Sequence, residues 1–198
     1  MNIIKRNLGL DKRKWKTSPL LGQIVLVSTI SRDRIPNLAP KSWIAVAAFN
    51  PLIIGFGCTL KHQTAKNICE TGEFVINVPS EDLVKKVWKT AYSPHFGDIE
   101  LQKLGFTMIP SVKVSPPRIR ECKAHLECIY ESDKRYGNEI WIYGKTVFVS
   151  IDKEALEGSS QERHKYLNPI FYLEKNTYSA LGDVKAIQTR RYRSPTSE

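Results

Sequence analysis

The segment from Gln23 to Cys58 reads QIVLVSTISRDRIPNLAPKSWIAVAAFNPLIIGFGC. It contains apolar stretches rich in β-branched residues, and a polar turn at 31–34 and an Asn-Pro pair separate these stretches. Runs of this kind between short turn signals are typical of β-strands, and strands joined by tight turns run antiparallel. We therefore predict three consecutive antiparallel strands, at 23–30, 37–48 and 52–58.

The hydrophobic period changes after these strands. Thr64 is suited to cap a short helix over 65–71, and Gly72 is suited to end it, because a hydroxyl accepts a bond from the first turn and glycine adopts the left-handed conformation. Ser80 is expected to cap a second short helix, with acidic residues in its first turn and lysines near its end, as the helix dipole favours.

Three further strands are predicted at 74–78, 123–131 and 139–151, the last two joined by a hairpin that contains Gly137-Asn138. Residues 91–117 carry prolines and glycines without a clear period. A long irregular segment of this kind is often a lid or an arm that covers a partner. Many antiparallel strands with few short helices predict a mainly β fold, a closed or nearly closed barrel that leaves few exposed sheet edges.

The chain has 198 residues, enough for one domain, and a formal net charge of +10. It contains no apolar run of the roughly 18 residues that a membrane span needs, and its N-terminus lacks the apolar core of a signal peptide. The four cysteines form no C-x-x-C pair and the four histidines are scattered. We therefore expect a cytoplasmic protein with reduced thiols, no metal site and no membrane association.

The positive charge favours anionic partners, such as nucleic acid, membrane surfaces or phosphorylated small molecules, although basic tails often serve solubility alone. A specific anion site is indicated where the third strand meets the first helix. A helix N-terminus offers free N–H groups and a partial positive charge, so it favours phosphate. Lys61 would add a charge there and Thr64 a hydroxyl donor. The alternative is that Thr64 only caps the helix and Lys61 is solvated.

An ordered set of motifs runs through the chain: PNLAPKSW (36–43), FNP (49–51), GFG (55–57), HQTAKNI (62–68), ETGEFVINV (70–78), SPP (115–117), LEC (126–128), LNPI (167–170) and YSALG (178–182). The set resembles the flavin reductase-like domain family, which includes flavoredoxins and the reductase components of two-component monooxygenases. The resemblance implies an FMN-binding split β-barrel, antiparallel and Greek-key-like with a few short helices, over residues 21–182. A basic arm (1–20) and a basic tail (183–198) would flank it.

The resemblance also implies a homodimer with FMN, or alternatively FAD, at its interface. Carried over by position, the flavin contacts from the second strand are Lys41, Ser42 and Trp43. Those from the third strand and the turn after it are Cys58, Thr59, Leu60 and Lys61, and the phosphate or ribityl contacts are Thr64 and Asn67. Ala48 stands where many relatives have serine. A lost neutral hydrogen bond costs about 1 kcal/mol, so we expect weaker flavin binding there.

The implied activity is NAD(P)H-dependent flavin reduction, with hydride transferred to flavin N5. His95, in the irregular segment, is the one catalytic candidate, because it could cover the flavin or meet a nicotinamide; a histidine in such a segment is more often a surface loop residue. An alternative is a non-enzymatic flavoredoxin-like carrier that keeps FMN and exchanges electrons with a partner protein. A nucleic-acid-binding barrel is disfavoured, because the basic residues do not interleave with aromatic ones as a stacking platform requires.

Overall fold

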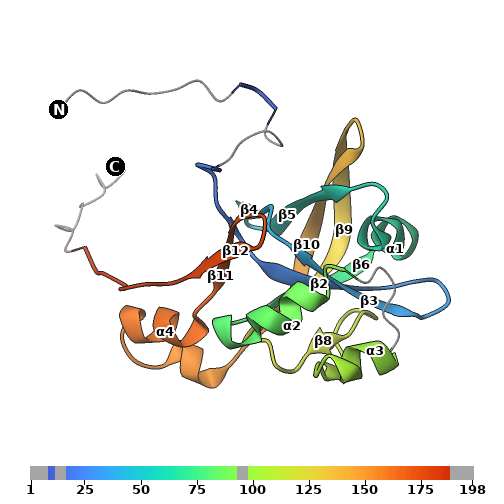
Figure 1. The fold of residues 1–198 in the computed structure, drawn as a ribbon. Helices are drawn as coiled ribbons and strands as arrows, with labels where there is room; N and C mark the ends of the chain where they lie inside the picture. The colour runs from blue at the N-terminus through green and yellow to red at the C-terminus, as the bar shows by residue number, and fades with distance from the viewer. Residues whose placement is uncertain (1–8, 12–16, 93–97, 188–198) are drawn as a thin grey trace, which may run out of the picture.

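The fold is built on a seven-stranded antiparallel sheet with strand order β3-β2-β6-β9-β10-β5-β4. A computed structural model describes residues 9–11, 17–92 and 98–187 (Figure 1). The sheet curls into a barrel that is not closed, because its edge strands β3 and β4 do not pair with each other. Its strands are β2 (Val25–Ile30), β3 (Pro36–Lys41), β4 (Ile44–Phe49), β5 (Leu52–Thr59), β6 (Glu73–Val78), β9 (Ala124–Tyr136) and β10 (Glu139–Ile151).

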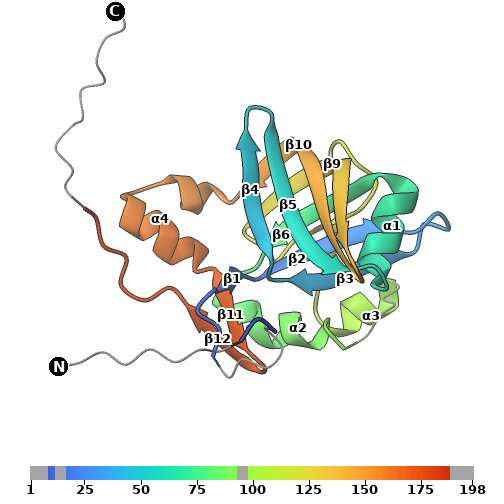
Figure 2. The ribbon, with the colours of Figure 1, turned by 90° about the horizontal axis from the view of Figure 1, so that it is seen from above.

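Smaller elements surround the barrel (Figures 1 and 2). A second sheet has the order β1-β11-β12, and β7 pairs with β8. The short strands are β1 (Gly22–Gln23), β7 (Met108–Ile109), β8 (Arg118–Ile119), β11 (Ile170–Glu174) and β12 (Thr177–Ala180). The helices are α1 (Gln63–Thr71), α2 (Val84–Lys89), α3 (Asp98–Lys103) and α4 (Ser160–Leu167), with 3-10 turns at Glu81–Leu83 and Lys153–Leu156. No helix among the described residues is long and apolar enough to cross a membrane.

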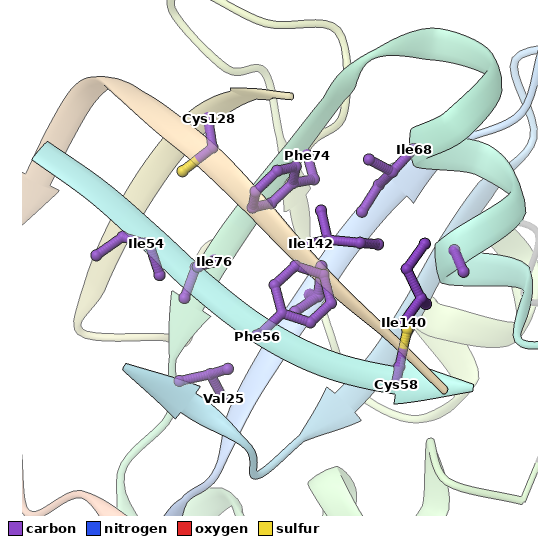
Figure 3. Close-up of a cluster of buried hydrophobic side chains, with 12 residues drawn as sticks. Val25, Ile54, Phe56, Cys58, Ile68, Phe74, Ile76, Cys128, Ile140 and Ile142 are labelled. Atoms are coloured by element: carbon purple, nitrogen blue, oxygen red, sulfur yellow. The ribbon is translucent and has the colours of Figure 1, made fainter. Parts of the chain in front are cut away.

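The core lies on both faces of the sheet. Inside the barrel, Val25 and Val27 of β2 pack with residues such as Phe56, Phe74 and Ile142 (Figure 3). On the outer face, Ile24, Leu26 and Leu38 pack with side chains of α2 and α3, among them Val87 and Leu101. A strand buried on both faces has no polar side to alternate with, which explains the continuous apolar run from Ile24 to Val27 at the start of β2.

The predicted antiparallel strands and mainly β fold are confirmed, but the predicted strand 37–48 is wrong in one respect. Two strands, β3 and β4, take its place, and Ser42 and Trp43 lie between them. A Cβ atom built on Gly22 would lie 1.6 Å from the Ser42 carbonyl oxygen, so the chain crosses β1 at this point in direct backbone contact. The crossing separates β3 from β4. The strand propensities of the residues at 37–48 do not reveal it, because it depends on a contact with β1.

The predicted end of the first helix is confirmed, because Gly72 has a φ of 74°. Its predicted start is wrong: α1 begins at Gln63, the preceding residue is His62, and no side chain caps the helix. Ser80 does precede a helical turn, but its hydroxyl donates to the carboxylate of Asp82 and caps no N–H group.

Residues 98–117 are more ordered than the sequence predicts for the segment 91–117. They contain α3 and β7, and carboxylates on the barrel hold part of their backbone. Glu127, which is fully buried, accepts bonds from the N–H groups of Val112 and Lys113, and Glu73 accepts one from Ser115. These side chains satisfy backbone donors that have no strand partner, so residues 112–115 are fixed to the barrel.

Candidate functional site

A cleft of about 460 Å³ opens beside the N-terminal end of α1; we call it the first cleft. β3, the β5–α1 turn and the end of α2 form its walls. Of the described residues that line it, three are basic and none is acidic, which favours an anionic ligand. The lining residues are Asn37, Ala39, Pro40, Lys41, Lys61, His62, Gln63, Thr64, Thr90 and Ala91.

The N-terminus of α1 supplies donors to this cleft. The first hydrogen bond of the helix joins Lys66 N–H to the His62 carbonyl, at 3.2 Å. The N–H groups of Gln63, Thr64 and Ala65 therefore make no backbone bond with a described residue, and no side chain caps them. Free N–H groups and the helix dipole together make this end of α1 suitable for a phosphate.

A buried polar network lies directly under the helix N-terminus. Asn67 is fully buried; its amide donates to Thr29 Oγ1 at 3.0 Å and its carbonyl oxygen accepts from Gln63 at 2.7 Å. Asn37 donates to Thr64 Oγ1 at 3.4 Å, which leaves the Thr64 hydroxyl proton free to be donated. Thr64 thus lines the cleft, whereas Asn67 lies behind it and positions Gln63.

Lys41 is buried, with 7% of its surface exposed. Its ammonium makes no ion pair or hydrogen bond with any residue in the described part of the chain. Burial lowers the pKa of Lys41, and the nearby Cys58 thiol acts in the opposite direction. A buried cation without an anionic partner is costly, so an anion bound beside Lys41 would stabilise its charge.

His62 shares this electrostatic environment. Burial, followed by the charge of Lys41, lowers its pKa, and Glu139 opposes that shift. One oxygen of Glu139, Oε2, is buried without a hydrogen-bond partner in the described structure. An anion in the first cleft would favour the protonated form of His62, as it would that of Lys41.

A second cleft, of about 280 Å³, continues from the first and shares Pro40, Lys41 and Ala91 with it. Ser42 lines it beside Lys41. Its other lining residues come from β1–β2, from α2 and the residues that follow, and from the β11–β12 hairpin: Ile24, Val87, Trp88, Tyr92, Tyr172, Lys175 and Asn176. The sequence did not single these residues out, because they are far apart in the chain and only tertiary packing brings them together.

The remaining predicted site residues line neither cleft. Cys58 packs inside the barrel (Figure 3), where burial raises the pKa of its thiol to about 11. Leu60 packs against the same core, and Thr59 uses its carbonyl to accept the His62 N–H at 3.1 Å. Any ligand contact from Cys58 would have to come from its backbone.

Trp43 is 43% exposed and lies over Gly57, where a Cβ atom would approach both Trp43 and Trp141. It faces the outside of the barrel. Ala48 lies toward the other end of β4 and lines neither cleft. His95 lies outside the described residues.

Comparison with known proteins shows to which family this chain belongs. The model of the flavin reductase-like domain matches residues 18–180, a range that contains every residue of both clefts. The chain belongs to the flavin reductase-like domain family. An uncharacterised protein of Pyrococcus abyssi is 34% identical over 122 residues, which is 62% of this chain and 70% of that protein.

Two solved structures illustrate the fold of the family. Flavoredoxin of Desulfovibrio vulgaris (Miyazaki F) has a TM-score of 0.80 at 20% identity, over 96% of this chain and 98% of that one. Nitrilotriacetate monooxygenase component B from Bacillus cereus has a TM-score of 0.79 at 24% identity, over 94% and 98%. The resemblance inferred from the sequence motifs and the split-barrel fold that it implied are both confirmed.

Proposed function

We propose that this protein binds FMN at the junction of the two clefts and is an oxidoreductase, with NAD(P)H-dependent flavin reduction as its activity. The observation that carries the proposal is the placement of Lys41. Its buried charge, which has no partner among the described residues, lies where the first cleft, with its uncapped helix N-terminus, meets the second cleft. FMN combines an anionic phosphate, which suits the helix N-terminus, with a planar ring, which would lie beside Lys41 at the junction.

The residues present fit such a cofactor. The phosphate would be held by the free N–H groups of α1 together with Lys61, His62 and the Thr64 hydroxyl, all of which line the first cleft. The ring would lie against Pro40, Lys41 and Ser42 at the junction. FAD would add a second nucleotide beyond the phosphate of FMN. We propose FMN because the cationic groups of the first cleft gather at the end of α1, where the FMN phosphate would lie.

When bound, the flavin supplies the redox chemistry by accepting a hydride at N5. The protein has to bind and orient it and to stabilise the negative charge that reduction places on the ring. Lys41 can do this because its ammonium is held in a largely water-free environment, where a charge–charge interaction is stronger than in solvent. Ser42 adds a hydroxyl donor beside it. No side-chain acid–base pair is needed.

A homodimer is part of the proposal. β4 is an edge strand, and Val46 and Phe49 on it are 50% and 88% exposed, although they pair with Ile54 and Leu52, whose side chains face the core. On the opposite face of β5, Gly55 and Gly57 lie against the rings of Tyr143, Trp141 and Trp43. An exposed apolar edge strand beside an aromatic surface favours a covering partner. We propose that a second copy of this chain covers this surface.

The test is the visible spectrum of the purified protein before and after addition of FMN and desalting, followed by anaerobic NADH or NADPH. Flavin bands that survive desalting and bleach with a reduced nicotinamide support a reductase. Retained flavin that bleaches only with a reduced partner protein supports the alternative, an electron carrier. A protein that retains no flavin and does not quench FMN fluorescence contradicts both.

A further inference from the structure

The second cleft has a wall that FMN at the junction does not occupy. α2 contributes Val87 and Trp88 to this wall, and the β11–β12 hairpin contributes Tyr172, Lys175 and Asn176. Its volume of about 280 Å³ lies just below the range typical of pockets for drug-sized ligands, roughly 300–1,000 Å³. A compound of one ring suits this space.

The wall is aromatic. Trp88 and Tyr172 stack with ring centroids 6.2 Å apart and an interplanar angle of 27°. Tyr92 stands at the mouth of the cleft and is 72% exposed, and Ile24 and Val87 form a buried apolar floor. Aromatic side chains with an apolar floor favour a planar ring, because offset stacking adds to the gain from burial.

The polar groups of the second cleft point to a negative charge on that ring. Lys41 lines one end and Lys175 the other, with Ser42 and Asn176 beside them. No carboxylate is among the described residues that line the cleft. Lys175 lies in the β11–β12 turn with a φ of 47°, and its side chain is exposed, so its ammonium is available to a ligand.

We propose that the second cleft binds a small aromatic anion, such as a benzoate-type carboxylate, next to the flavin. The aromatic ring packs along Trp88 and Tyr172, and Lys175 pairs with the carboxylate. The position next to the flavin rests on the proposed function, whereas the binding itself rests on the cleft.

The experiment is calorimetric titration of the FMN-loaded protein with benzoate, cyclohexanecarboxylate and benzamide. Cyclohexanecarboxylate keeps the charge without the planar ring, and benzamide keeps the ring without the charge. Benzoate should bind about tenfold more tightly than either, because only benzoate makes both kinds of contact. Lys175→Gln should weaken benzoate binding about five- to tenfold, and Tyr172→Leu by a similar factor.

Lys134→Gln is the matched control. Lys134 is an exposed lysine of β9 that lines neither cleft, so this variant should bind benzoate as the unaltered protein does. Equal affinity for benzoate and cyclohexanecarboxylate, or benzoate binding that Lys175→Gln leaves unchanged, would overturn the proposal. Competition between benzoate and FMN would also overturn it, because the cleft would then be part of the flavin site.

A parallel titration with FMN alone separates the two proposals. If the protein does not bind FMN but the apoprotein still binds benzoate through Lys175, the proposed function fails and the aromatic anion site stands. If FMN binds and benzoate does not, the proposed function stands and the aromatic anion site is wrong.

Discussion

Lys41 and His62 line one cleft from two different elements, β3 and the turn before α1, and the positive charge of Lys41 adds to burial in lowering the pKa of His62. The charge of Lys41 therefore disfavours the protonated form of His62 when no anion is present. An anion in the first cleft would reverse this effect, and this leads to measurable consequences for binding and stability.

The first prediction concerns Lys41. Lys41→Met removes a charge-assisted contact to the bound flavin, so FMN affinity should fall by roughly 10- to 100-fold, equivalent to about 1.5–3 kcal/mol. The same change removes a buried charge that has no anionic partner among the described residues, so the apoprotein should be as stable as before or more so. FMN fluorescence titration and urea denaturation of the apoprotein measure the two effects.

Lys66→Met is the control for this substitution. Lys66 is exposed on α1 and lines neither cleft, so both FMN affinity and stability should stay close to their original values. A Lys41→Met protein that loses stability and keeps its affinity for FMN would show that Lys41 is structural.

The second prediction concerns pH. The pKa of His62 is lowered in the free protein, and a phosphate in the first cleft would raise it, so FMN binding should take up a proton. The extra affinity from His62 is fully present below its pKa in the free protein and is lost as the pH rises through its pKa in the complex. FMN titrations from pH 5.5 to 8 should show this fall in affinity.

The phosphate of FMN titrates in the same pH range, so the test compares two proteins. The ratio of the FMN affinity of the original chain to that of His62→Asn should fall as the pH rises, because the phosphate contributes equally to both. Identical slopes in both proteins would mean that His62 does not meet the phosphate.

The third prediction concerns the buried network under α1. Asn67→Ala removes the side-chain partner of Gln63 and one of the two amide donors to Thr29 Oγ1, and the free energy of unfolding should fall by about 1–3 kcal/mol. Glu70→Ala, at an exposed position of the same helix, should cost much less. Urea denaturation measures both, and a small effect of Asn67→Ala would mean that water or another residue replaces its hydrogen bonds.

The fourth prediction concerns the exposed edge strand β4. Phe49→Asp places a charge on the most exposed apolar side chain of that strand, and it should convert a dimer into a monomer. Light scattering coupled to size-exclusion chromatography measures the mass. Leu156→Asp, at another exposed apolar position, should leave the dimer intact; dissociation by both substitutions would point to a general effect of charge.

Much of the barrel could be predicted because its strands carry local signals. The β-branched run of β2 and the turn at 31–34 are visible in the sequence. The break at Ser42 and Trp43 is not, because it depends on contact with Gly22 of β1. Strand alternation alone could have placed Cys58 correctly: Ile54, Phe56 and Cys58 face the core, and Gly55 and Gly57 between them face outward.

The first cleft was easier to predict than the second. Lys61 and Thr64 are neighbours in sequence at a helix N-terminus, and Lys41 belongs to a family motif, so all three could be identified before the fold was known. Trp88, Tyr172 and Lys175 carry no such local signal. They meet only because α2 packs against the β11–β12 hairpin.

The central claim is that the N-terminus of α1, with Lys61 and His62, holds the phosphate of FMN. The most direct test compares the binding of FMN with that of riboflavin, which has the same ring and no phosphate, by fluorescence titration. We predict that FMN binds at least about tenfold more tightly than riboflavin, and that Lys61→Gln reduces this difference in affinity. Equal binding of both flavins, or no binding of either, would contradict this assignment.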